Sequence, residues 1–83
     1  MAPMEPPSAL LRAARVALDI SQSELANRCG LSKRTVYNVE QGQGTLDTIH
    51  RIRKTLEGEG IKFMLNEDDP AYWPGFRVDP SIL

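Results

Sequence analysis

Four side chains between residues 33 and 38 carry hydrogen-bonding groups that match the edges of nucleic-acid bases. They are Lys33, Arg34, Tyr37 and Asn38. Lysine and arginine donate to guanine O6 and N7, asparagine pairs with adenine N6 and N7, and a tyrosine ring can meet a thymine methyl group. We take each residue's angular position around the helix axis, at about 100° per residue and with Lys33 at 0°. The four polar side chains then lie between about 0° and about 140°, whereas Val36 and Val39 lie at about 300° and about 240°. Residues 33–41 therefore predict a helix with an apolar inner face and a basic, amide-bearing outer face.

Few other residues have a type and a spacing that suit chemistry. His50 is the only histidine and Cys29 the only cysteine, and neither has partners at the spacing of a metal site or of a nucleophile–base pair. We expect His50 at the surface, Cys29 as a small buried residue, and the acidic run 67–69 as a solvated turn. The sequence therefore predicts no metal site, no cofactor and no enzymatic activity.

The helix over residues 33–41 is preceded by a second helix with a strong start signal. Ser21 and Glu24 form a capping box, in which each side chain accepts a hydrogen bond from the backbone amide of the other residue. This preceding helix ends at Gly30, where a left-handed conformation costs glycine nothing. Ser32 is placed to cap the following helix, which Gly42 ends. Two helices joined by a short glycine-centred turn are typical of a helix-turn-helix.

The rest of the chain predicts three further parts. We expect a loose, proline-rich arm over residues 1–7, and a helix over residues 9–18 with Ser8 as its N-cap. A fourth helix begins at Thr45, ends at the glycines 58 and 60, and carries an apolar stripe made of Leu46, Ile49, Ile52 and Leu56. Residues 61–65 alternate as a strand does, and residues 75–78 could add a second strand. The expected fold is mostly α: a bundle of about four helices over residues 8–58, then a short C-terminal β-strand or β-ribbon with a helix-free tail over residues 59–83.

Composition and charge exclude several classes of protein. The chain has 83 residues and a net charge of −1, which is room for one domain. Residues 1–56 carry eight basic and five acidic groups, whereas residues 57–83 carry two basic and six acidic ones, so a polyanion would meet the first two thirds. One cysteine excludes an internal disulfide, and no apolar run approaches the roughly 20 residues of a membrane span. With no signal peptide at the N-terminus, we expect a cytoplasmic location and no membrane partner.

The spacing of these residues resembles a known family. The run 21–26 (SQSELA), the turn 30–32 (GLS), Val36 and the run 39–42 (VEQG) look like the phage-repressor-type helix-turn-helix, also called Cro-like or Xre. The resemblance covers about residues 9–57 and implies a lambda-repressor-like bundle that binds double-stranded DNA. It implies that Lys33, Arg34 and Asn38 read bases; we add Tyr37 as a reader from the helical face it shares with them. The resemblance also implies phosphate contacts from Gln22, Gln41 and the loop 42–44, which contains Gln43 and Gly44; we add Ser32 to this set.

Two charged residues fall on the inner faces of the predicted helices. Arg15 lies between the apolar residues of the first helix, and Glu40 lies just beyond Val36 on the third. A lone buried charge is very costly, so opposite charges on facing stripes indicate a partly buried ion pair that joins the two helices. The resemblance supports this pair, and we interpret it as structural.

These features favour one function and leave another open. We expect a sequence-specific transcriptional regulator, in its simplest form a repressor that binds a short palindromic operator as a homodimer. The C-terminal ribbon is the expected dimer interface, in which strands from two subunits form one small sheet, through Ile61, Phe63, Leu65, Trp73, Phe76 and Val78. Alternatively, the ribbon folds back on its own helices as a lid. The alternative function is an antitoxin of a toxin–antitoxin pair, which represses its own gene and binds a toxin through the acidic tail.

Overall fold

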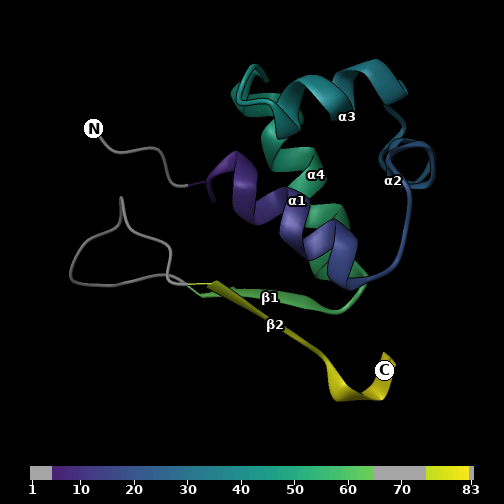
Figure 1. The fold of residues 1–83 in the computed structure, drawn as a ribbon, viewed down its shortest axis with the longest axis vertical. Helices are drawn as coiled ribbons and strands as arrows, with labels where there is room; N and C mark the ends of the chain where they lie inside the picture. The colour runs from purple at the N-terminus through teal and green to yellow at the C-terminus, as the bar shows by residue number, and fades with distance from the viewer. Residues whose placement is uncertain (1–4, 65–74, 83) are drawn as a thin grey trace.

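The fold is a small helical bundle backed by a two-stranded antiparallel ribbon (Figure 1). The computed structural model describes residues 5–64 and 75–82. Its elements in order are α1 (Ser8–Ala17), α2 (Gln22–Cys29), α3 (Lys33–Glu40), α4 (Leu46–Gly58), β1 (Ile61–Met64), β2 (Gly75–Val78) and a 3₁₀ turn (Pro80–Ile82). The mostly α class and the four helices followed by a short ribbon are confirmed. The 3₁₀ turn is a difference, since the tail was expected to be free of helix.

One apolar core joins all four helices to the ribbon. The largest fully buried side chains come from each helix in turn: Leu11, Leu25, Val36, Val39, Ile52 and Leu56. Full burial of an aliphatic side chain of this size stabilises the folded state by about 1.5–3 kcal/mol. Because α3 has only eight residues, the core contacts of Val36 and Val39 decide which of its faces remains exposed.

The helix-turn-helix is defined by the local signals in its sequence. The Ser21 hydroxyl accepts from the amide of Glu24 at 3.0 Å, and the Glu24 carboxylate accepts from the amide of Ser21 at 3.1 Å. Gly30 ends α2 in the left-handed region with φ of 70°. The Ser32 hydroxyl then accepts from the amide of Thr35 at 3.1 Å and caps α3. The start of α3 is therefore fixed locally, because its N-cap Ser32 follows two residues after Gly30, the C-cap of α2.

The N-terminal segment differs from the expectation. Ser8 is the first residue of α1 and not its cap, because Pro7 takes the extended N-cap position and no side chain caps the helix. Pro6 is buried, and the carboxylate of Glu5 accepts from Arg53 of α4 at 2.6 Å. The described end of the arm, residues 5–7, is thus held against the bundle. The apolar stripe of α4 also begins later than expected, because Leu46 is 66% exposed.

The ribbon folds back on its own helices. β1 and β2 pair antiparallel with Ile61 opposite Val78 and Phe63 opposite Phe76. Ile61 and Phe63 are only 3% and 8% exposed, and Phe76 and Val78 pack against the same core. The expectation that Ile61 and Phe63 face a second subunit is corrected: α1 and α4 leave an apolar face that this chain covers itself. Leu65 and Trp73 lie outside the described residues.

Gly44, before α4, lies in a place too crowded for a larger side chain. A Cβ atom at this position would lie 2.4 Å from Cγ2 of Val39 and 3.3 Å from Cγ1 of Ile49. We predict that Gly44→Ala lowers the free energy of unfolding by about 1–3 kcal/mol through overpacking. Urea denaturation followed by circular dichroism measures this change.

Gly58→Ala is the matched control. Gly58 is the last residue of α4, and its Cβ would meet no atom within 4 Å. Alanine should be neutral there or should stabilise by up to about 1 kcal/mol. Equal effects of the two substitutions would contradict the crowding assigned to Gly44.

Candidate nucleic-acid interface

Helix α3 lies along one end of the molecule, with α2 beside its start and the ribbon at the opposite end (Figure 1). Val36 and Val39 are 0% and 1% exposed and fix the inner face of α3. Lys33 and Arg34 are exposed, Tyr37 is 45% exposed and Asn38 is half-buried. Of the four expected base readers, three therefore extend from the outer face, and Asn38 lies at its border.

The N-termini of α2 and α3 meet around a shallow hollow. Its lining residues are Gln22, Lys33, Arg34 and Tyr37. The hollow brings together one residue expected at a phosphate and three expected at bases. Asn38 does not line it. Gln41 and Gln43, which were expected at phosphates, are exposed after the other end of α3, and Gly44 beside them is half-buried.

The cations of this face differ from most other cations of the bundle. Arg28 pairs with Glu59, Arg51 with Asp47, Arg53 with Glu5 and Glu57, and Lys54 with Glu57. Within residues 5–64 and 75–82, no carboxylate pairs with Lys33 or Arg34. Two uncompensated positive charges at the exposed start of one helix suit a polyanionic partner.

A buried ion pair holds α3 against α1. Arg15 donates from Nε to Oε2 of Glu40 at 2.7 Å and from Nη2 to Oε1 at 3.0 Å. Its Nη1 also donates to the carbonyl oxygen of Ile20 at 2.9 Å. The two side chains are 13% and 2% exposed. This paired geometry joins the helices as the sequence predicted, and it satisfies a carboxylate that would be very costly to bury alone.

Gln22 extends this pair toward the surface. Its Nε2 donates to Oε1 of Glu40 at 3.1 Å. No sequence pattern predicted this contact, because the two residues are 18 positions apart and belong to different helices. An amide nitrogen has two hydrogens, so one remains for an outside acceptor. The Ser32 hydroxyl, in contrast, already caps α3 and lies 2.9 Å from the hydroxyl of Thr35.

The other residues considered for chemistry do not join this face. His50 lies on α4, 3.0 Å from the carboxylate of Glu5, and no sequence signal linked it to the proline-rich arm. Burial raises the pKa of the Cys29 thiol above its ordinary value, more than the hydrogen bond to Thr55 and the charge of Arg51 lower it. In the described parts of the chain, no group of three or more His, Cys, Asp or Glu residues could hold a metal ion.

Comparisons with known proteins agree with this architecture. A family model described as helix-turn-helix matches residues 11–58. An uncharacterized HTH-type transcriptional regulator of Methanothermobacter thermautotrophicus is 38% identical over 63 residues, which cover 71% of this chain and 91% of that protein. An adenine deaminase of Aspergillus fumigatus is 36% identical over 76 residues, which cover 92% of this chain but only 18% of the deaminase. The second similarity therefore concerns a small part of a much longer protein.

Among the described helices, none is both long and apolar enough to cross a membrane.

The Arg15–Glu40 pair leads to a stability prediction. Arg15→Met or Glu40→Leu leaves the partner charge buried without its counterion, and each should cost about 3–5 kcal/mol. The double variant replaces both charges by apolar groups and should be more stable than either single variant. Chemical denaturation of all four proteins measures the coupling.

The pair Arg28–Glu59 is the matched control, because both of its side chains are more exposed. Glu59→Ala should cost under about 1 kcal/mol. If the costs of Arg15→Met and Glu40→Leu simply add in the double variant, the two charges do not depend on each other in the folded protein.

Proposed function

Because this chain belongs to the helix-turn-helix family and is a DNA-binding transcription regulator, we propose that it recognises a specific operator through the outer face of α3. Lys33, Arg34, Tyr37 and Asn38 are the proposed base readers. The observation that carries this proposal is that Lys33 and Arg34 are exposed and unpaired among the described residues. Both are exposed at the N-terminal end of the second helix of the motif, which is the end that enters the major groove, and neither has an acidic partner among the described residues.

We further propose that groups on both sides of α3 contact phosphates. Gln22 and Ser32 lie at the starts of α2 and α3, whereas Gln41, Gln43 and Gly44 lie between α3 and α4. Such contacts fix the register of the protein on the duplex without selecting a sequence. Gln22 is the strongest member of this set, because its bond to Glu40 holds the amide at the rim of the α3 hollow. Ser32 is the weakest, since its hydroxyl oxygen already accepts the capping bond.

Recognition of one operator requires more than one copy. A single reading helix covers about four to five base pairs, which cannot distinguish one site in a genome. A two-fold dimer reads two half-sites about 34 Å apart, so its operator is a palindrome. Repression is the simplest outcome, because a protein bound over a promoter excludes other proteins from it. We therefore propose a homodimeric repressor.

The antitoxin alternative has less support. It depends on the acidic charge of residues 57–83 as a surface for a toxin. Within that segment, Glu57 pairs with Arg53 and Lys54, and Glu59 pairs with Arg28. The run 67–69 lies outside the described residues. Two of the acidic groups thus already serve the chain's own fold.

The specificity of the α3 face can be tested by selecting preferred sites from random duplex DNA. We predict that the selected site is palindromic, and that Arg34→Ala and Asn38→Ala each cost about 1–3 kcal/mol of binding free energy on it. Both variants should lose much less affinity for unrelated DNA, because they remove base contacts. Equal losses on selected and unrelated DNA would mean that these residues touch only phosphates.

Gln22→Ala should behave differently. It removes a proposed phosphate contact, so we predict the same fractional loss of affinity on selected and unrelated duplexes, with an unchanged preferred sequence. Fluorescence anisotropy on both duplexes measures this effect. Ser23→Ala, an exposed neighbour on α2, is the control and should leave affinity unchanged. A shift in the preferred sequence on Gln22→Ala would assign this residue to base reading.

A further inference from the structure

We propose that Glu40 is a positioning residue for DNA binding, because its hydrogen bond holds the carboxamide of Gln22 in one orientation for a phosphate of the duplex. The side chain of Glu40 is only 2% exposed, so it acts on DNA through Gln22 and not by direct contact. The inference rests on the proposed function and adds a residue to it. It gives the ion pair between Arg15 and Glu40 a role in binding as well as in folding.

The Glu40 carboxylate accepts hydrogen bonds from two other helices. Its Oε2 accepts from Nε of Arg15 at 2.7 Å, and its Oε1 accepts from Nη2 of Arg15 at 3.0 Å and from Nε2 of Gln22 at 3.1 Å. Arg15 is held in turn, because its Nη1 donates to the carbonyl oxygen of Ile20 at 2.9 Å. The acceptor that meets Gln22 is therefore fixed by the packed interior of the bundle and not by a flexible surface side chain.

The charge of Glu40 decides which end of the Gln22 carboxamide faces it. A carboxylate accepts hydrogen bonds and donates none, whereas a carboxamide has an accepting oxygen and a donating nitrogen. A reversed Gln22 would place its own oxygen against Oε1 of Glu40, and neither atom could donate. Nε2 of Gln22 therefore faces the carboxylate, and its second hydrogen remains for another acceptor. A phosphate oxygen of DNA is such an acceptor.

Both ends of the Gln22 side chain are anchored. Gln22 is the first residue of α2, directly after the capping box that Ser21 forms with Glu24, so its backbone is fixed. The bond to Glu40 fixes the carboxamide at the other end. The anchored amide lines the hollow at the starts of α2 and α3, where Lys33 and Arg34 also lie.

A side chain that is already held loses less freedom when a partner binds. Ordering a long side chain at an interface weakens binding by roughly two- to tenfold. Gln22 is half-buried, and the bond to Glu40 orders it before DNA arrives. Loss of this acceptor should therefore weaken DNA binding by a factor in the same range, although no atom that touches DNA is removed.

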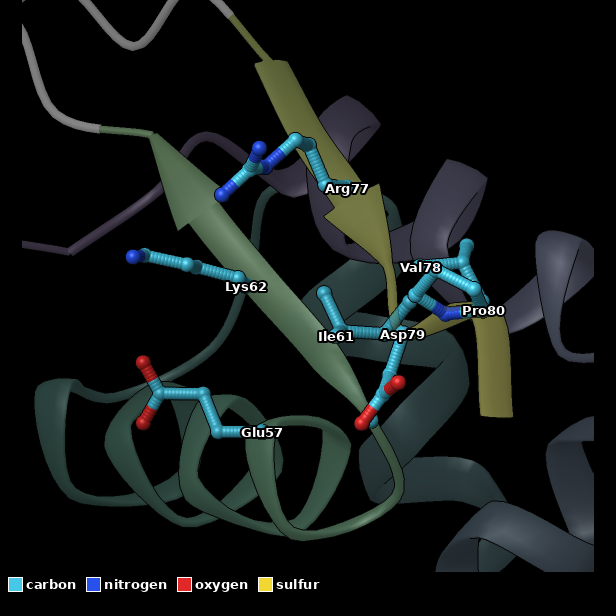
Figure 2. A pocket seen from close by; sticks show the side chains of 8 residues that line it. Glu57, Ile61, Lys62, Arg77, Val78, Asp79 and Pro80 are labelled. Carbon is cyan, nitrogen blue, oxygen red and sulfur yellow. The ribbon is translucent and has the colours of Figure 1, made fainter. Parts of the chain in front are cut away.

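The ribbon provides a surface for comparison. Lys62 and Arg77 are exposed and lie opposite each other on β1 and β2, and Figure 2 shows their side chains on the outer side of the ribbon. Neither cation pairs with a carboxylate of the described chain. The ribbon lies at the end of the molecule away from α3 (Figure 1), so salt screens its charges from DNA bound at α3.

Two double variants of the full-length chain test the role of Glu40. Arg15→Met/Glu40→Leu, the leucine double variant, removes the acceptor of Gln22 without leaving a buried charge. Arg15→Met/Glu40→Gln, the glutamine double variant, also removes both charges but keeps an oxygen that can accept from Gln22. Fluorescence anisotropy on the selected and unrelated duplexes should show a loss of about two- to tenfold for the leucine double variant. The glutamine double variant should lose less.

Adding Gln22→Ala to each protein completes the test. This substitution should weaken DNA binding by the wild-type chain and by the glutamine double variant, but it should have almost no further effect on the leucine double variant. Arg28→Met/Glu59→Leu, which removes a more exposed ion pair, and Lys62→Gln on the ribbon are the controls. Both should leave the affinity and the effect of Gln22→Ala unchanged. Thermal denaturation checks that every variant is folded during the binding measurement.

The opposite results would overturn the proposal. An equal effect of Gln22→Ala in the wild-type chain and in the leucine double variant would show that Glu40 does not position Gln22. A glutamine double variant that binds no better than the leucine one would exclude a role for the hydrogen bond. If Gln22→Ala has no effect on the wild-type chain, the inference fails, while Arg34→Ala still tests base reading by α3. If the wild-type chain binds neither duplex, the proposed function fails and the inference fails with it.

Discussion

A buried carboxylate sets the constraint on which the rest of this structure depends. Glu40, at the end of α3, is 7% exposed as a whole residue. A carboxylate buried in that position must be paired and hydrogen-bonded. Arg15 of α1 meets both carboxylate oxygens and the carbonyl of Ile20, and Gln22 of α2 donates to one of them. The pair therefore ties α1, α2 and α3 together at one point and, together with Val36 and Val39 in the core, it fixes how α3 is rotated on the bundle.

The rotation of α3 determines what its exposed face can bind. With Val36 and Val39 in the core, Lys33, Arg34 and Tyr37 are exposed on the opposite face. Within residues 5–64 and 75–82, most other cations of the bundle are paired with carboxylates, whereas Lys33 and Arg34 are not. The weak overall charge of −1 therefore hides a local positive surface at the end of the molecule opposite the ribbon (Figure 1), which is the surface proposed to bind DNA.

The sequence predicted what local chemistry determines. Ser21, Glu24, Gly30 and Ser32 act within a few residues of their own position, so the helix-turn-helix could be placed almost to the residue. The sequence could not predict what covers the apolar face of the ribbon. An alternation such as that of Ile61 and Phe63 is the same whether a strand packs on its own helices or on another chain. Contacts between distant segments, as between Glu5 and Arg53, leave no local pattern either.

A nuclear magnetic resonance titration can measure whether the exposed face of α3 meets the bases of DNA. The chain, at 9.3 kDa, is labelled with ¹⁵N and ¹³C and titrated with a duplex that carries its selected site. If this face reads bases, we expect shift changes at the starts of α2 and α3 and in the loop before α4, with intermolecular contacts from the Arg34 and Asn38 side chains to base protons. Shift changes on the outer face of the ribbon, at Lys62 and Arg77, with α3 unaffected, would contradict it.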